Sequence, residues 1–299
     1  MPMPTELKIP TPRNFSFKRT VASHGWYQLP PFALDSDKWQ LTRVIDVGTK
    51  PPVTISLTGS MTGRKNHVRV TTARQLNKAE TAIVLRDARH ILRLDDDLEN
   101  FYLSTGSDPE FSWIAEQGAG RMLRSPTVFE DLVKMICTTN CSWSLTLKMV
   151  NGLVENLGRE TEDGRRAFPT PQVMASMPPK FFVDKVRAGY RAPYLKELAE
   201  RVASGELNVE QWLTTDLPTR DLVKQIKSVK GAGDYAAENL LRLLGRYDGL
   251  ALDSWTRAKF FQVRNNGRKA SDKKIARYYS RFNEWRGLAL WCDVTRDWL

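Results

Sequence analysis

The sequence predicts an α+β fold in which an N-terminal antiparallel sheet lobe is followed by an all-helical lobe. Apolar and polar residues alternate with a period of two in several short segments between Phe15 and Leu92. From Leu94 onward the apolar residues recur with a helical period instead. A chain of 299 residues with 41% hydrophobic content is also long enough to bury a core in each of two lobes.

The sheet lobe is expected over residues 14–93, after a proline-rich stretch at 1–13 that is expected to be a loose arm. Glycine and proline residues separate the alternating segments of this lobe, as is typical of turns between strands. The predicted strands cover residues 39–47, 53–57, 67–70 and 82–85.

The helical lobe is expected over residues 94–299. Spacing of apolar residues by three or four positions predicts each of its helices. They cover approximately residues 96–104, 109–117, 126–139, 143–157, 179–187, 192–203 and 208–214, then a pair at 222–245, and finally 254–263 and 271–298.

Charge is the strongest compositional signal. The formal net charge is +11, which costs self-repulsion and favours a polyanionic partner. Nucleic acid is the first candidate, and an anionic membrane surface is the second. The residues Met1–Thr5 lack the order of a signal peptide, and no run of about 18 apolar residues is present, so a cytoplasmic, nucleoid-associated protein is expected.

The cysteines predict no disulfide framework. Cys137, Cys141 and Cys292 are few and scattered, and their spacing is not that of the four thiolates that bind an iron–sulfur cluster. Reduced thiols and no such cluster are expected. The three histidines have no metal-ligand spacing and receive no role.

The segment 222–245 predicts a helix-hairpin-helix. Leu222 and Ile226 begin a helical pattern that Gly231 and Gly233 interrupt, and Asp234 is placed to cap the second helix. Two glycines one residue apart allow a tight turn and bring backbone N–H groups to a helix N-terminus, where they suit a phosphate. Lys227 and Lys230 flank the turn and are expected to face phosphate.

A lone carboxylate follows the hairpin. Asp253 ends the apolar run 249–252 just where another helix begins. An Asp in this position is most often only an N-cap, but its place about 20 residues after the hairpin favours a catalytic role.

The C-terminal part of the chain is strongly basic. Between Arg257 and Arg286 ten Lys and Arg residues occur against Asp272 and Glu284. A solvated helix face would mix the two signs, so a phosphate-facing surface is favoured over a surface that serves solubility alone.

These features resemble the helix-hairpin-helix (HhH-GPD) DNA glycosylase superfamily, and within it the 8-oxoguanine DNA glycosylases. The hairpin followed by Asp253 is one match. The segment Phe129–Asn140 is similar to the helix of that family that ends in Ile-Cys-Ser-Ser-Asn, and Ala188–Tyr194 is similar to its Gly-Tyr-Arg-Ala-x-Tyr turn. The resemblance covers roughly residues 94–299, and the sheet lobe fits the architecture of the family.

The resemblance implies a role for each matching residue. Asp253 would be the catalytic carboxylate, and Gly231 and Gly233 would present amides to a phosphate. In the loops, Asn140 would fill the gap left by an extruded base, Tyr190 would wedge the duplex, and Arg191 would contact the orphaned partner base. A monovalent cation would be held at the hairpin by the main-chain carbonyls of Lys227, Val229 and Ala232.

The base pocket departs from the 8-oxoguanine pattern. The nucleophilic lysine of the bifunctional members is replaced by Tyr235, and their second orphan-base arginine by Leu145. In having an aromatic residue at the lysine position, the chain is similar to the alkylpurine (3-methyladenine) branch of the family. Members of that branch hydrolyse the N-glycosidic bond with the Asp alone. The other expected pocket residues are Asn239, Trp255, Leu290 and Val294.

The sequence therefore predicts a monofunctional DNA glycosylase of base excision repair that flips a damaged base from duplex DNA, with Asp253 as its catalytic carboxylate. Two alternatives stay open: a bifunctional 8-oxoguanine glycosylase and AP lyase, and a non-catalytic binder of damaged or abasic DNA. A monomer is expected, with no cofactor other than the cation at the hairpin.

Overall fold

The sheet of the N-terminal lobe has five antiparallel strands in the order β1-β5-β4-β3-β2. A computed structural model describes residues 5–48, 50–62 and 65–299. Alternate residues of the strands are buried, as in Leu41 of β3 and Leu57 of β4, which face each other across the ladder. The strands are β1 (Glu6–Pro10), β2 (Phe32–Asp35), β3 (Gln40–Ile45), β4 (Val53–Thr62) and β5 (Lys65–Thr72).

The N-terminal stretch corrects one expectation. Residues 6–10 are not a loose arm but the edge strand β1, in which Ile9 is buried and pairs with Val68 of β5. The flanking prolines concealed the strand, yet Pro10 is tolerated because an edge strand has one side without a ladder partner.

Residues 82–85 correct a second expectation, since they belong to the helix α2 (Lys78–Ile91) rather than to a strand. Asn77 and Glu80 form a capping box that starts this helix. Val84, Ala88 and Ile91 are fully buried at helical spacing, so the apolar run 82–85 is only the middle of a helical stripe.

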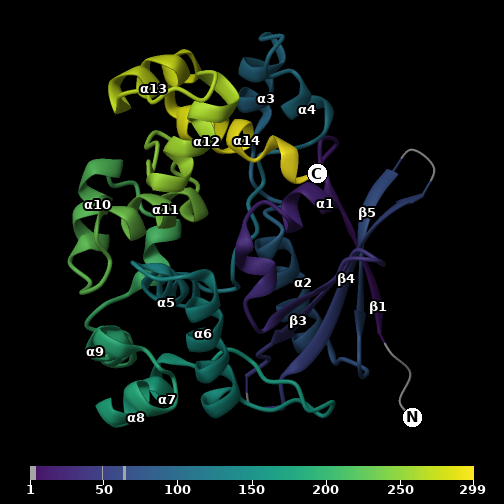
Figure 1. Ribbon diagram of the computed structural model, residues 1–299. Coiled ribbons are helices and arrows are strands. Elements are labelled where there is room, and N and C mark those ends of the chain that lie inside the picture. The colour runs from purple at the N-terminus through teal and green to yellow at the C-terminus, as the bar shows by residue number, and fades with distance from the viewer. Residues whose placement is uncertain (1–4, 49, 63–64) are drawn as a thin grey trace.

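Helices and their connecting loops make up most of the rest of the described chain, and most of these helices lie to the left of the sheet in Figure 1. The α-helices that follow α1 (Phe17–Val21) and α2 are α3 (Glu99–Gly106), α4 (Trp113–Glu116), α5 (Val128–Thr138), α6 (Trp143–Leu157), α7 (Pro171–Ser176), α8 (Pro179–Asp184), α9 (Ala192–Ala203), α10 (Thr219–Lys227), α11 (Asp234–Leu244), α12 (Ser254–Arg264), α13 (Asp272–Tyr279) and α14 (Arg286–Val294). The expected helix at 208–214 is a short 3-10 helix (Val209–Leu213), and the expected helix at 271–298 is broken at Asn283, whose φ is 49°. These elements confirm the α+β fold with a sheet lobe followed by a helical lobe.

A buried ion cluster fastens the sheet to the helices. Arg43 of β3 donates two hydrogen bonds, of 2.8 and 2.6 Å, to the carboxylate of Glu130 on α5, and Lys134 lies 2.6 Å from the same carboxylate. Burial opposes the ionisation of Glu130, but the two cations hold its pKa down at about 2. Each charge is paired, which is what makes burial of all three tolerable.

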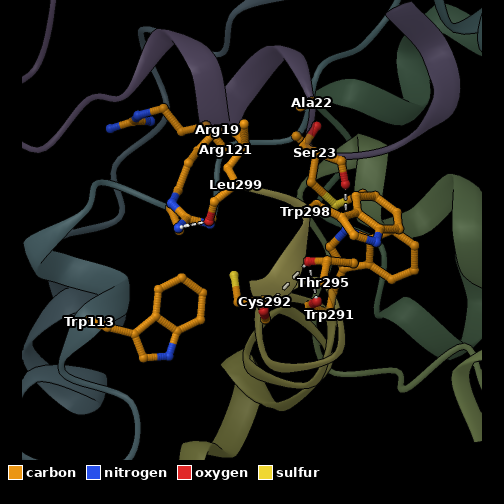
Figure 2. Close-up of a pocket in the computed structure, with 13 residues that line it drawn as sticks. Arg19, Ala22, Ser23, Trp113, Arg121, Trp291, Cys292, Thr295, Trp298 and Leu299 are labelled. Carbon is orange, nitrogen blue, oxygen red and sulfur yellow. Dashed lines mark hydrogen bonds between the residues drawn. The ribbon is translucent and has the colours of Figure 1, made fainter. Parts of the chain in front are cut away.

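The end of the chain also packs against the sheet lobe. Figure 2 shows Arg19 of α1 close to Leu299, to whose carbonyl it donates a 2.7 Å hydrogen bond. The indole N–H of Trp291 on α14 donates to the carbonyl of Ser23 at 2.9 Å. The cavity between them, of about 30 Å³, has room for about one water molecule, so this seam is structural. The hydrogen bond to Ser23 orients the indole of Trp291.

Candidate active site

The helix-hairpin-helix is formed by α10, the turn 228–233 and α11. Val229 and Ala232 are buried and anchor the turn in the core. Gly231 has φ +88°, and a Cβ on it would lie 2.8 Å from the ring of Tyr194, so only glycine fits there. Gly233 is exposed, and a Cβ on it would meet nothing within 4 Å, which leaves its surface open to a ligand.

The N-terminus of α11 is uncapped. Gly233 holds the N-cap position, where the sequence had suggested Asp234, and no side chain accepts from the first amides of the helix. These N–H groups therefore lack partners among the described residues, a situation that attracts an anion. Asp234 instead lies 2.6 Å from Lys227, and Lys230 lies 2.7 Å from Glu197 of α9.

Asp253 is the N-cap of α12. Its Oδ1 accepts a 2.6 Å hydrogen bond from the backbone amide of Thr256. The loop before it is held on one side by Arg242, which donates to the carbonyl of Leu250. On the other side Gly287 of α14 donates to the carbonyl of Tyr247 at 2.8 Å, and a Cβ on Gly287 would lie 1.9 Å from a backbone oxygen of this loop.

Two adjoining cavities meet at Asp253 and Tyr235. An open groove of about 790 Å³ runs past the hairpin, and a pocket of about 520 Å³ lies beside it. Both cavities share the same four boundary residues: Thr138, Cys141, Tyr235 and Asp253. Burial raises the pKa of the Tyr235 phenol, and the nearby Asp253 carboxylate acts in the same direction, so Tyr235 is neutral near pH 7.

The pocket is walled by tryptophans. Trp255, Trp291 and Trp298 contact one another with ring centroids 5.7 to 5.9 Å apart. Trp143 of α6 completes the wall and donates to Gln28 at 2.6 Å. Such a pocket suits a planar, aromatic ligand.

Asn239 is a polar residue of α11 that lines this pocket, and the buried Arg242 lies behind it. The guanidinium of Arg242 donates to the Asn239 amide oxygen at 3.1 Å and lies 4.9 Å from the Trp291 ring centroid. Asn239 itself donates to the carbonyl of Tyr235 at 2.9 Å, which orients its amide. Burial lowers the pKa of Arg242 to about 10, against the opposing effect of Asp253, so the guanidinium remains a buried cation at neutral pH.

The sheet lobe supplies pocket residues that the sequence did not reveal. His24, Gly25, Trp26 and Gln28 line the pocket opposite α11. The His24 ring donates to the carbonyl of Leu123 at 2.6 Å, and burial lowers its pKa to about 4, so the imidazole is neutral. No sequence signal for this contribution existed, because the segment has neither a motif nor a metal-ligand spacing.

Two expected pocket residues lie elsewhere. Leu290 and Val294 are fully buried in the core and do not line the pocket. Trp291, one position after Leu290, lines it in their place together with Trp298. The correction follows from the face of α14 that turns towards α11, which the sequence alone did not reveal.

The two loops over the groove are joined by Arg191. Asn140 and Tyr190 line the groove; Tyr190 is 53% exposed, and Asn140 is exposed with φ +46°. Arg191 was expected to reach a base, but it is only 3% exposed and donates to the carbonyl of Thr139, with its guanidinium 4.3 Å from the Tyr190 ring centroid. In this conformation it positions the other two residues instead.

The described part of the chain contains neither a metal-binding cluster nor a membrane-spanning helix. Within residues 5–48, 50–62 and 65–299, no group of three or more His, Cys, Asp or Glu residues is arranged to hold a metal ion. None of the helices in the same ranges is long and apolar enough to cross a membrane. The three cysteines are free thiols.

Comparison with known proteins places the chain in a family. A model of the HhH-GPD superfamily of base excision DNA repair proteins matches residues 133–285, which include the hairpin and Asp253. An N-glycosylase/DNA lyase of Saccharomyces cerevisiae is 27% identical over 172 residues, which are 53% of this chain and 45% of the yeast protein. The chain thus spans less than half the length of that relative.

Solved structures show the same fold. The 3-methyladenine DNA glycosylase of Archaeoglobus fulgidus superposes with a TM-score of 0.75 at 21% identity, covering 98% of this chain and 99% of the other. The 8-oxoguanine glycosylase/lyase of Clostridium acetobutylicum, in complex with double-stranded DNA, superposes with a TM-score of 0.69 at 20% identity, covering 99% and 98%. Resemblance thus extends to proteins of both the alkylpurine and the 8-oxoguanine kinds, and the family match spans half of the chain. This protein belongs to the HhH-GPD superfamily of base excision DNA repair proteins.

Proposed function

We propose that this protein is a monofunctional DNA glycosylase, which flips a damaged base out of duplex DNA and hydrolyses its N-glycosidic bond. One observation carries the proposal: Asp253 stands at the boundary between an open groove and a tryptophan-walled pocket, and no lysine is among the described residues that line either cavity. A carboxylate can promote hydrolysis of the glycosidic bond, whereas the lyase reaction also needs an amine nucleophile.

The groove has the features that a DNA backbone requires. The uncapped amides at the start of α11 and the open surface of Gly233 would receive a phosphate, beside Lys230. Tyr190 and Asn140 would enter the duplex, since they are exposed on adjacent loops whose positions Arg191 ties together. The DNA complex of the Clostridium relative supports DNA as the partner of this fold.

The pocket would hold the extruded base. A base is planar and stacks on aromatic faces, and three tryptophans in mutual contact provide such faces next to Asp253. Asn239 would offer an amide N–H to an acceptor atom on the base edge, because Arg242 occupies its amide oxygen. Flipping is needed because the bond to be cleaved is unreachable in the stacked duplex.

The chemistry falls to Asp253. When the bond between the base nitrogen and C1′ breaks, the electron pair leaves with the base, and positive charge develops on the sugar. The fixed carboxylate stabilises that charge and accepts the proton of the water that attacks C1′. The helix cap holds one carboxylate oxygen in place and thereby limits the reorganisation needed during the reaction.

The lyase step has no suitable nucleophile in this arrangement. Tyr235 holds the position expected for the lysine, and a phenol cannot form a Schiff base. Lys227 and Lys230 are paired with Asp234 and Glu197 and do not line the pocket. The turn carbonyls of Lys227, Val229 and Ala232 are proposed to hold a monovalent cation, although the Val229 carbonyl already accepts a hydrogen bond from the Ala232 amide.

A panel of duplexes, each with one modified base, tests the proposal. Wild-type protein should convert at least one of them into an abasic strand that breaks only after hot alkali, and Asp253→Asn should not. Strand breakage without alkali would support the bifunctional alternative. Tight binding to abasic DNA with no base released from any duplex would support the non-catalytic binder.

A further inference from the structure

The basic C-terminal segment contains two kinds of cation that the fold separates. One kind is engaged within the protein. Arg264 contacts Asp293 and Glu110 at 2.6 and 2.7 Å, and Arg281 lies 3.0 Å from Asp108. The remaining engaged cations are Arg257 with Asp272, Lys259 with Asp297, and Arg286 with the carbonyl of Asp248.

The other kind is free of carboxylates. Five exposed residues form what is here called the α13 basic surface, and none of them lies within 4.0 Å of an acidic group in the described part of the chain. Lys274 alone has a side-chain contact, a 2.7 Å hydrogen bond to the neutral amide oxygen of Asn265. The α13 basic surface consists of Arg268, Lys269, Lys273, Lys274 and Arg277.

The surface stands on a fixed support. Ile275 and Tyr279 of α13 are fully buried, and the Tyr279 hydroxyl donates to Asp293, which also binds Arg264. The buried face thus holds α13 in place, while the cations project from the rest of the helix and from the turn before it. Five like charges held together without counter-charge cost repulsion, which a bound polyanion would relieve.

We propose that the α13 basic surface binds the phosphates of one arm of the DNA duplex, several base pairs away from the nucleotide whose base is removed. The proposal rests on the proposed function for the identity of the duplex. It adds a second contact region, separate from the hairpin and the groove, which extends the footprint of the protein on one side of the lesion.

The distance follows from α12, which links the two regions. Asp253 caps its N-terminus, and the basic surface begins just beyond its C-terminus at Arg264. A helix of 11 residues is about 16 Å long at 1.5 Å per residue. A duplex rises about 3.4 Å per base pair, so with α12 aligned along the duplex the surface would meet phosphates about five base pairs from the reacting sugar.

The surface fits a duplex better than other polyanions. Protein interfaces are enriched in aromatic residues and depleted in lysine. The α13 basic surface has the opposite composition, and the exposed large apolar side chain near it is Val263. Binding to a membrane surface is strongest where apolar side chains enter the lipid alongside the cations, and the α13 basic surface consists of cations alone. Phosphate contacts need only charge and reach, which these five residues supply.

The test compares two matched triple variants. K269Q/K273Q/R277Q removes three cations of the α13 basic surface, and K8Q/R13Q/K78Q removes two lysines and one arginine that are exposed on the sheet lobe. Figure 1 shows β1, which carries Lys8, on the opposite side of the molecule from α13. The affinity of each for a duplex with one central abasic-site analogue is measured by fluorescence anisotropy between 50 and 200 mM salt.

The α13 variant should lower the slope of log affinity against log salt by about 2.7, at about 0.9 for each phosphate that is no longer neutralised. Over that salt range the wild type would lose about 40-fold more affinity than the variant. The sheet-lobe variant should keep the wild-type slope. Shortening one arm of the duplex to four base pairs should lower the wild-type slope and leave the α13 variant unaffected.

An unchanged slope in the α13 variant, or an equal fall in both variants, would overturn the proposal. So would binding of wild-type protein to phosphatidylserine vesicles that the α13 variant loses while its DNA slope stays normal. Base release is scored separately. Failure to release any base, together with the expected change in slope, would refute the glycosylase function but not this DNA contact.

Discussion

The carboxylate of Asp253 accepts a hydrogen bond from the amide of Thr256 at 2.6 Å, so the candidate catalytic residue is also a helix cap. The bond uses Oδ1. In the described part of the chain no hydrogen bond to Oδ2 is formed. The cap fixes the orientation of the carboxylate, and Oδ2 remains available to a sugar or a water. One local interaction thus serves both the start of α12 and the orientation of the proposed catalytic group.

Replacement of Asp253 by Asn should abolish base release while the fold and the DNA affinity are kept. Asn caps a helix as well as Asp does, but it carries no charge to stabilise a cationic sugar. A fall in the rate of base release of at least about 100-fold is expected, measured in single-turnover assays.

Asp253→Ala is the companion variant. It should lose the same activity and also about 1 kcal/mol of stability, because the cap is removed with the charge. Undiminished base release by Asp253→Asn would remove Asp253 from the mechanism.

Borohydride added during turnover should trap no covalent complex between protein and DNA. A trapped adduct requires a Schiff base from an amine, and Tyr235 provides only a phenol. The measurement is a denaturing gel of reactions with and without borohydride, with strand breakage scored before and after hot alkali. An adduct that persists in Tyr235→Phe and disappears with a single lysine substitution would show that another amine acts as nucleophile.

Replacement of Arg242 by Met should shift the preference of the enzyme towards positively charged bases. The guanidinium is a buried cation 4.9 Å from the Trp291 ring centroid, so it repels a cation stacked on the other face of the ring. The ratio of kcat/KM for 7-methylguanine, which is cationic, to that for an uncharged lesion should rise about tenfold, which corresponds to about 1.4 kcal/mol.

Arg242→Lys keeps the charge and is the control, with an expected ratio near that of the wild type. The comparison of ratios is necessary because Arg242 also holds Leu250 in the loop before Asp253, so absolute rates should fall in both variants. An equal ratio in the Met and Lys variants would show that the charge has no role in selectivity.

Replacement of Lys230 by Gln should reduce the salt dependence of DNA binding by about one in the slope of log affinity against log salt. Lys230 pairs with Glu197 at 2.7 Å, but both side chains are substantially exposed, so a phosphate can displace the carboxylate at little cost. Glu197→Gln should therefore keep the wild-type slope or increase it. The same slope in wild type and Lys230→Gln would place Lys230 outside the DNA contact.

Mild acid should destabilise the fold through His24. Burial lowers the pKa of His24 from 6.5 to about 4, so below pH 6.5 the unfolded chain takes up a proton that the folded chain excludes. The stabilisation by the neutral ring is therefore complete above pH 6.5 and falls as the pH drops towards 4. At pH 5 the loss is about 2 kcal/mol, at 1.36 kcal/mol per pKa unit.

Urea unfolding of wild type and His24→Gln at pH 7.5 and pH 5 isolates this loss, because His90, whose pKa burial lowers to about 3, adds a loss in the same pH range to both proteins. Glu130 does not affect the comparison. Its pKa is about 2 in the folded protein, so its contribution to the free energy of unfolding falls only below about pH 4.5. His24→Gln keeps a donor for the Leu123 carbonyl and should show about 2 kcal/mol less pH dependence than the wild type. Equal pH dependence in the two proteins would contradict the assignment to His24.

Local patterns were sufficient for much of the fold. Residue spacing predicted the strand β3, the first half of β4 at 53–57 and both helices of the hairpin, and capping chemistry predicted the start of the helix that follows Asp253. They were readable because each depends on neighbours within a few positions. The apolar run 82–85 was misread for a related reason: four residues cannot distinguish a strand from the middle of a helix.

The order of sheet lobe, hairpin and capped Asp253 follows from local patterns in the chain, because turns, caps and periodicity act between neighbouring residues. The set of side chains that share the pocket depends on long-range contacts, since periodicity shows that a face is buried but not what covers it. Ser23 and Trp291 are 268 positions apart, yet their hydrogen bond helps to orient the tryptophan wall. Tertiary contacts likewise decided that Arg264 and Arg281 are engaged by acidic groups, while the α13 basic surface is left free for a partner.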